Sequence, residues 1–297
     1  MSTIILLGAG ASFGSEGVTP YPPPLGNKLF SELEKLEGIA KSLPDDIKAE
    51  FNNNFEAGMA KYYKHSNGDI MQFQRELASY LANFSPLQNN VYVDLLKSIK
   101  LNRVIFSSLN YDLLLELSAL GLGHSISYNS TPVKGALRLL KIHGSSNFWP
   151  DLPVGMCDGL VAANNGKGDI SAPVKPLNQK DTLYRCGREK GLAPAIAMFA
   201  EGKSVRVSPE FVDQQYSMWK SAVEKASKIF VIGVRVHEVD EHIWNVFGQS
   251  KAWFAYFGFN GDKPEFNDWK NRHNKKNAYF YENDFKSSVE IIKNRTK

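Results

Sequence analysis

Three polar side chains follow apolar runs at positions where they could carry out acid–base chemistry. Asn110 and Asp112 come shortly after Val104-Ile105-Phe106, and His143 comes directly after Leu139-Leu140-Lys141-Ile142. Imidazole titrates close to neutral pH, so His143 can act as a general base. An amide side chain both donates and accepts hydrogen bonds, so Asn110 can orient a sugar hydroxyl or an attacking water. We take Asn110, Asp112 and His143 as the candidate catalytic residues.

A glycine-rich stretch near the start of the chain has the composition of a phosphate-binding loop. Gly8-Ala9-Gly10-Ala11-Ser12 follows the apolar run 3–7 directly. Glycines let a backbone approach a pyrophosphate closely, and the amides ahead can donate to it. We expect a tight turn here; the alternative is a plain turn, since the spacing departs from GxGxxG at Phe13. The candidate cofactor-binding residues of this stretch are Gly8, Ala9, Gly10 and Ser12.

The elements that must position these residues alternate between strand and helix patterns. The expected strands are 3–7, 104–106, 139–142, 204–207, 228–232, 253–257 and 278–281. The expected helices are 26–39, 45–64, 69–83, 88–99, 209–225, 240–247 and 285–293, with Ser208 as an N-cap and Pro209 in the first helical position. Such alternation predicts an α/β fold with a Rossmann-like, doubly wound parallel sheet. The carboxyl ends of its strands would then bring the candidate residues to one edge.

We expect a single domain over 1–297, with a helical insertion at about 26–99 beside the sheet. A proline-rich loop precedes it, and an irregular, glycine-containing segment at about 151–190 has the composition of a flap. Hydrophobic content of 43% and charged content of 22% are ordinary for a globular chain of 297 residues. The net charge of +4 is weak, and we find no motif for binding nucleic acid.

Several classes of site and location are disfavoured. No apolar run approaches the ~18 residues that span a bilayer, and the opening residues lack the basic flank of a signal peptide. We expect a cytoplasmic protein that does not bind a membrane. Cys157 and Cys186 are the two cysteines. They cannot form a zinc ribbon, which needs four ligands at paired spacing, and we expect no metal.

Taken together, the motifs resemble the sirtuin-like superfamily. The resemblance rests on motifs that occur in the family's order from residue 4 to about 258: Gly8–Ser12 for the glycine loop, Asn110-Tyr111-Asp112 for Asn-x-Asp, His143-Gly144 for His-Gly, 192–201 for a Leu-Arg-Pro-type stretch, and Gly233-Val234-Arg235 for Gly-Thr-Ser. The resemblance implies that NAD is the substrate. It also implies that Asp112 meets the nicotinamide carboxamide, and it adds Ser145, Gly233, Val234 and Asp240 to the candidate cofactor-binding residues.

The chain is more similar still to the bacterial antiviral-defence branch of that superfamily. That branch carries Asn-Tyr-Asp, Lys-x-His-Gly-Ser and a segment ending Asp-x-His-Ile, which stand here as 110–112, 141–145 and 232–243. The likeness implies an NAD glycohydrolase that depletes NAD when a phage infects the cell. Because such an activity needs gating, we expect a homo-oligomer or a sensor or motor partner encoded nearby.

The differences from deacylases favour hydrolysis over deacylation. The zinc ribbon and the Gly-Ile-Pro-Asp-Phe-Arg loop are absent, and Leu109 replaces a glutamine. An NAD-dependent protein deacylase and a non-catalytic NAD or ADP-ribose binding module remain as alternatives.

Each candidate residue also has a structural alternative. His143 could be a structural histidine, Asn110 a helix N-cap, and Asp112 a partner of a helix dipole. Asp240 and His242 could brace the sheet edge or line an adenosine pocket.

Overall fold

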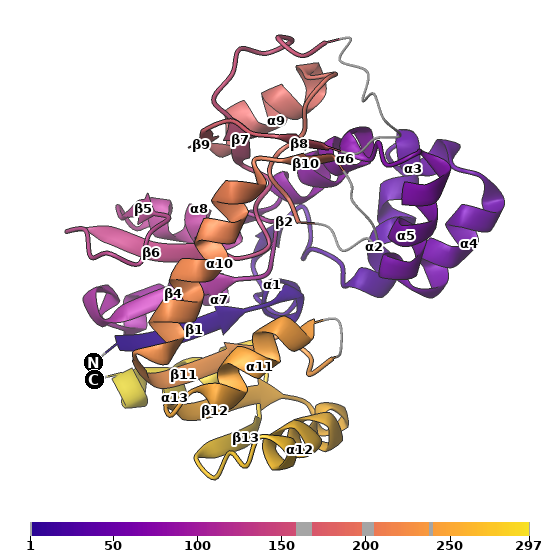
Figure 1. The fold of residues 1–297 in the computed structure, drawn as a ribbon. Coiled ribbons are helices and arrows are strands. Elements are labelled where there is room, and N and C mark those ends of the chain that lie inside the picture. Colours follow the sequence, from indigo (N-terminus) through magenta and orange to yellow (C-terminus); the bar gives the residue numbers. More distant parts are fainter. Residues whose placement is uncertain (1, 159–167, 198–204, 238–239, 297) are drawn as a thin grey trace.

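The centre of this computed structural model is a parallel sheet; the structure describes residues 2–158, 168–197, 205–237 and 240–296 (Figure 1). Within them, seven strands pair in the order β13-β12-β11-β1-β4-β6-β5, and every neighbouring pair is parallel. The strands are β1 (Ser2–Leu7), β4 (Val104–Ser108), β5 (Ser125–Ser127), β6 (Ala136–Lys141), β11 (Ala226–Ile232), β12 (Trp253–Gly258) and β13 (Ala278–Glu282). The expected Rossmann-like α/β fold class is confirmed.

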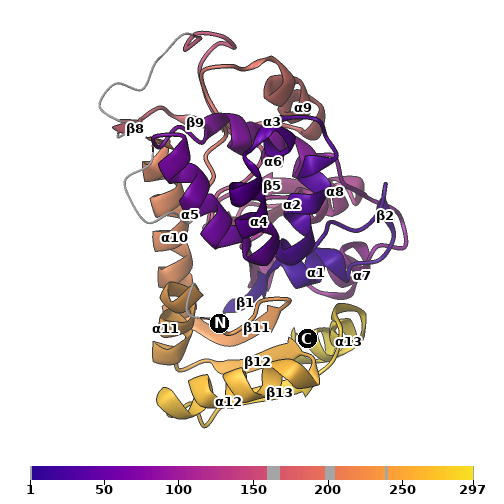
Figure 2. The same ribbon diagram turned by 90° about the vertical axis from the view of Figure 1, so that its right-hand side faces the viewer.

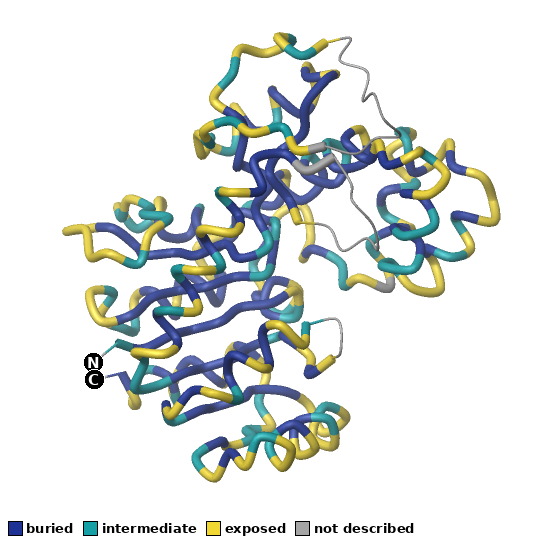
Figure 3. The backbone as a smooth tube through the Cα atoms, viewed as in Figure 1, coloured by how far each residue is buried: buried dark blue, intermediate teal, exposed yellow. Residues whose placement is uncertain are grey.

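Helices cover both faces of this sheet because its strands carry apolar side chains on both sides. Ile5 and Leu7 of β1 pack in one core with helices α7, α8 and α13, whereas Ile4 and Leu6 pack in another with α10, α11 and α12. Figure 2 shows α10 and α11 on one side of the sheet and α7 and α13 on the other. In Figure 3 the central strands are buried along most of their length. These helices are α7 (Val91–Ser98), α8 (Leu114–Gly121), α10 (Pro209–Glu224), α11 (Glu241–Gln249), α12 (Lys263–Arg272) and α13 (Phe285–Thr296).

The strand register brings four loops to the same level at one edge of the sheet. Leu7 of β1 pairs with both Ser108 of β4 and Ile232 of β11, and Ser108 in turn pairs with Lys141 of β6. These four residues are at or next to the ends of their strands, so the segments that follow them meet. The chain passes from β1 to β4 on one side and returns to β11 on the other, which makes the β1/β11 boundary the topological switch point.

A group of helices lies beyond this edge of the sheet (Figure 1). It comprises α2 (Gly26–Glu34), α3 (Ile39–Ser42), α4 (Asp45–Asn53), α5 (Phe55–His65) and α6 (Met71–Ala82). The short strands β2 (Val18–Thr19) and β3 (Ser85–Pro86) pair antiparallel and join the two ends of this group. Phe51 stacks between Phe30 and Phe73, with ring centroids 4.2 and 5.3 Å away.

A small unit packs against α6 at the far side from the sheet. It contains β7 (Phe148–Pro150) paired with β9 (Val174–Pro176), β8 (Gly168–Ile170) paired with β10 (Val205–Val207), and helix α9 (Gln179–Arg188). Arg185 of α9 donates to the backbone oxygens of Pro150 and Leu152 and lies 4.9 Å from the Trp149 ring centre. The sequence predicted an irregular segment over 151–190, but part of this segment forms helix α9 and strands β8 and β9. Residues 159–167 of it lie outside the described residues.

Other local predictions were also wrong. The expected tight turn at Gly8–Gly10 is instead the start of a short helix, α1 (Ala9–Phe13). The single helix expected over 45–64 divides at Asn54, whose side chain accepts from the amides of Glu56 and Ala57. Ser208 makes no side-chain cap, because its hydroxyl donates to the backbone oxygen of Ala172, although Pro209 does occupy the first turn as predicted.

Candidate active site

A cleft of about 1210 Å³ opens at the switch point, between the carboxyl edge of the sheet and helices α2 and α5. All four loops that follow the register-matched strands contribute to it. Gly8, Ala9, Gly10, Asn110, His143, Gly233, Val234 and Asp240 line this cleft. The other three candidate residues, Ser12, Asp112 and Ser145, are outside that lining and are buried. The structure thus places eight of the eleven candidate residues on one cavity.

The glycines of the first loop pack against a second glycine turn. A Cβ on Gly8 would lie 2.4 Å from the backbone oxygen of Gly233, and one on Gly10 would lie 2.8 Å from the Gly233 Cα. Gly233 itself has φ +67, a backbone conformation that residues other than glycine rarely adopt. The glycines are therefore required by contact between the loops, which their spacing in the sequence does not reveal.

The amides of this first loop are partly used within the protein. The N–H of Gly8 donates to Ile232, that of Gly10 to Gly233, and that of Ala11 to Gly8. The first two of these bonds fasten the loop after β1 to the end of β11. A pyrophosphate bound here would have to be held by other donors at this edge.

Asn110 joins the second loop to the first. Its Nδ2 donates to the backbone oxygen of Gly8 over 2.8 Å and to the Ser12 hydroxyl over 2.9 Å. The Ser12 hydroxyl donates in turn to Oδ2 of Asp112. The Tyr92 hydroxyl lies 2.9 Å from the Ser12 Oγ. Asp112 also accepts from the amide of Leu114 through Oδ1, at the start of α8. Asp112 therefore fixes the Ser12 hydroxyl, which in turn holds the Asn110 side chain.

Lys141 holds the same loop from the neighbouring strand. Its Nζ lies 3.1 Å from a carboxylate oxygen of Glu116, and both side chains are buried. Burial raises the pKa of Glu116, and Lys141 opposes that shift. The same ammonium donates to the backbone oxygen of Asp112.

His143 projects into the cleft just beyond the end of β6. The next residue, Gly144, has φ +83, and a Cβ there would lie 2.1 Å from the Ala195 oxygen. The backbone around it is held from both sides, because Ser145 N–H donates to Ala195 and Ala197 N–H donates to His143. This contact explains the glycine after the histidine. It also gives a role to the described part of segment 192–201; residues 198–201 lie outside the described residues.

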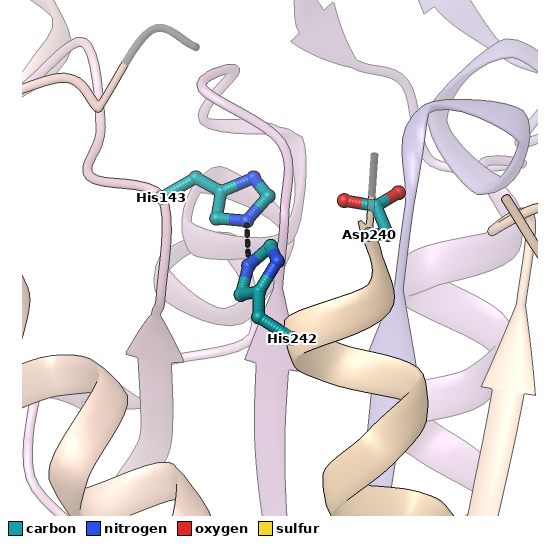
Figure 4. Close-up of side chains that lie close together, drawn as sticks. All are labelled: His143, Asp240 and His242. Atoms are coloured by element: carbon teal, nitrogen blue, oxygen red, sulfur yellow. Dashed lines mark hydrogen bonds between the residues drawn. The ribbon is translucent and has the colours of Figure 1, made fainter. Parts of the chain in front are cut away.

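A second histidine faces His143 across the cleft. The Nε2 atoms of His143 and His242 are 3.1 Å apart, and Figure 4 shows the two rings meeting through these atoms. Burial, reinforced by His242, lowers the pKa of His143 to about 4, so its ring is neutral at pH 7. His242 lies at the start of α11 and comes next but one after Asp240, whose pKa is raised by burial.

Some residues of the cleft were not foreseen from the sequence. Tyr111 lines the cleft and donates its hydroxyl to the backbone oxygen of Ala197. Arg235 also lines it, paired with Glu265 at 2.9 Å. The Asp-x-His spacing at Asp240 was visible in the sequence. The contact between His242 and His143 was not visible, because the two histidines are 99 residues apart in the sequence.

Neither a family model nor a curated protein matches this sequence. The chain is similar to a solved structure described as "Structural Basis for the Mechanism and Regulation of Sir2 Enzymes", with 11% identity and a TM-score of 0.43 over 99% of this chain and 91% of that one. It is also similar to one described as "The Structural basis of Sirtuin Substrate Affinity", with 13% identity and a TM-score of 0.46 over 100% of this chain and 94% of that one. At these identities the likeness is distant.

Proposed function

We propose that this chain is an NAD glycohydrolase that releases nicotinamide and ADP-ribose. The observation that carries the proposal is the cleft at the switch point, where Asn110 and His143 line one cavity together with the glycine loops of β1 and β11. Switch points of open parallel sheets are where such folds bind nucleotides. The cleft of about 1210 Å³ also exceeds the roughly 300–1,000 Å³ typical of drug-sized ligands, which suits an extended dinucleotide.

The reaction breaks the bond between the ribose C1′ and the nicotinamide nitrogen. Nicotinamide leaves with the electron pair, the sugar develops oxocarbenium character, and a water oxygen forms the new bond to C1′. Asn110 is suited to orient the water or a ribose hydroxyl, because it lines the cleft and its Nδ2 is held in place by Gly8 and Ser12. His143 accepts the proton that the water loses, which is a general-base role.

The contact between the two histidines decides which nitrogen of His143 can act as the base. Its Nε2 faces His242, whereas its Nδ1 makes no hydrogen bond with any described residue. Base action at Nδ1 requires the tautomer in which Nε2–H of His143 donates to Nε2 of His242. His242 then orients the base.

The test is incubation of the purified chain with NAD while free nicotinamide is measured by chromatography. The wild type should release nicotinamide, and His143→Ala should lower the rate by about 10²–10⁴-fold. His65→Ala, at an exposed histidine elsewhere, is the matched control and should keep the full rate. Formation of O-acetyl-ADP-ribose only with an acetylated peptide would instead identify a deacylase. Calorimetric binding of NAD without any turnover would identify a binding module.

We further propose that the biological role is NAD depletion during phage infection. A hydrolase that empties its own cell of NAD must be held inactive until it is needed, so we propose control by self-association or by a partner. Expression in infected cells, with total NAD measured over time, tests the role. An unchanged NAD level, alone and with the product of the neighbouring gene, would argue against it.

A further inference from the structure

Three side chains that carry metal-ligating atoms meet in the cleft. His143 follows β6, and Asp240 and His242 lie at the start of α11. One donor atom from each lies within 4.8 Å of the other two. Figure 4 shows all three side chains directed into the same space.

The spacing of the two imidazoles is compatible with a shared cation. Two nitrogens bound to one zinc ion at about 2.0–2.1 Å are roughly 3.3 Å apart at the tetrahedral angle, and slightly closer at smaller angles. The two Nε2 atoms here are 3.1 Å apart. Both rings must turn so that their Nε2 lone pairs point at one ion, and the His242 side chain is exposed.

The local charge also favours a cation. The Asp240 carboxylate is half-buried, and within the described part of the chain it accepts no hydrogen bond and forms no ion pair. Glu56 of α5 lies close enough to Asp240 for the two charges to interact, which adds negative potential. The His237 side chain also lies close enough to both acids to interact with them.

We propose that His143, His242 and Asp240 bind a divalent transition-metal ion such as Zn²⁺, and that this ion inhibits the enzyme. Two imidazoles and one carboxylate suit Zn²⁺, Co²⁺ or Ni²⁺, whereas Mg²⁺ and Ca²⁺ prefer oxygen ligands. These three ligands include no cysteine, so the cysteine spacing that argued against a zinc ribbon does not bear on this site.

The inhibitory half of the proposal rests on the proposed function. A metal bound to Nε2 of His143 leaves the ring proton on Nδ1. A ring in that state cannot accept a proton from water at Nδ1. The bound ion also separates His143 from His242, which removes the contact that orients the base.

The first experiment measures metal binding without any substrate. Metal-free protein is titrated with Zn²⁺ by calorimetry, and with Co²⁺ while its visible absorption bands are recorded. The wild type should bind one ion, and His242→Ala and Asp240→Asn should each weaken binding by about tenfold or more. His65→Ala, which removes an exposed histidine elsewhere, should bind as the wild type does. Thermal unfolding of each variant shows whether it is folded.

The second experiment measures nicotinamide release over the same range of Zn²⁺ concentration. Inhibition should follow the calorimetric binding curve, be reversed by EDTA, and require more Zn²⁺ in Asp240→Asn. Equal Zn²⁺ affinity in the wild type and both ligand variants would overturn the site, whatever the activity. Binding by an active enzyme without inhibition would overturn the inhibitory half alone. Binding by a chain without NAD turnover would uphold the site and contradict the proposed function.

Discussion

The Nζ atom of Lys141 donates to the backbone oxygen of Asp112 over 2.6 Å, which ties the strand that carries His143 to the loop that carries Asn110. The same ammonium pairs with the buried carboxylate of Glu116. A lysine two residues before His143 therefore sets the position of His143 relative to Asn110, although Lys141 does not itself line the cleft.

Lys141→Met should destabilise the protein strongly. The substitution leaves Glu116 buried without a cation, and loss of one partner of a buried pair costs about 3–5 kcal/mol. The free energy of unfolding in urea measures the effect. The double variant Lys141→Met/Glu116→Leu should recover much of the loss, because no unpaired charge remains. A double variant no more stable than Lys141→Met would contradict this explanation.

Ser12→Ala should weaken both stability and turnover. The change removes the hydroxyl that donates to Asp112 and accepts from Asn110, and a buried polar group left unsatisfied costs about 1–3 kcal/mol. Urea unfolding and the rate of nicotinamide release measure the two effects. Ser31→Ala, where an exposed hydroxyl bonds Asn52, should change neither. Equal effects of the two substitutions would show that the buried network does not hold Asn110.

The central strands could be predicted from the sequence because each is a short apolar run that is followed by glycine or polar residues. β1, β4, β11, β12 and β13 begin and end within two residues of the expected bounds. Helix α9 was missed because its composition is polar, although Asn178 is a cap whose side chain accepts from Asp181 N–H. Helix α12 was not among the expected helices either, although Pro264 marks its first turn.

The candidate site was accessible from the sequence only where a motif is local. Asn110 and His143 follow strands, and parallel strands end at a common edge. The meeting of His143 with His242 depends on the strand order and on how far α11 reaches, which no spacing records. The same limit applies to positions 8 and 10. Glycine is needed there because Gly233 packs against them across the switch point, which the sequence alone does not show.

Gly233→Ala should destabilise the protein by roughly 1–3 kcal/mol, because the residue has a positive φ. The added Cβ would also lie 2.1 Å from the Ala11 amide nitrogen and push the two loops apart. Gly121→Ala is the matched control, since no atom lies within 4 Å of a Cβ built at this helical glycine. That variant should be as stable as the wild type or more so. Urea unfolding of both compares them, and equal stabilities would contradict the packing argument.

Cys186 should resist alkylation in the folded protein and react only on unfolding. Burial raises the pKa of its thiol from 9.0 to about 12, so the reactive thiolate is scarce at pH 8. The half-buried Cys157 is the internal reference, and mass spectrometry after treatment with iodoacetamide should find it modified first. The raised pKa also makes the stability depend on pH. Between pH 9 and pH 12 the Cys186 thiol ionises in the unfolded protein but not in the folded protein, so the free energy of unfolding should fall over that range. Cys186→Ser should lose less stability over that range than the wild type, and equal labelling of both cysteines at pH 8 would show that the thiol is accessible.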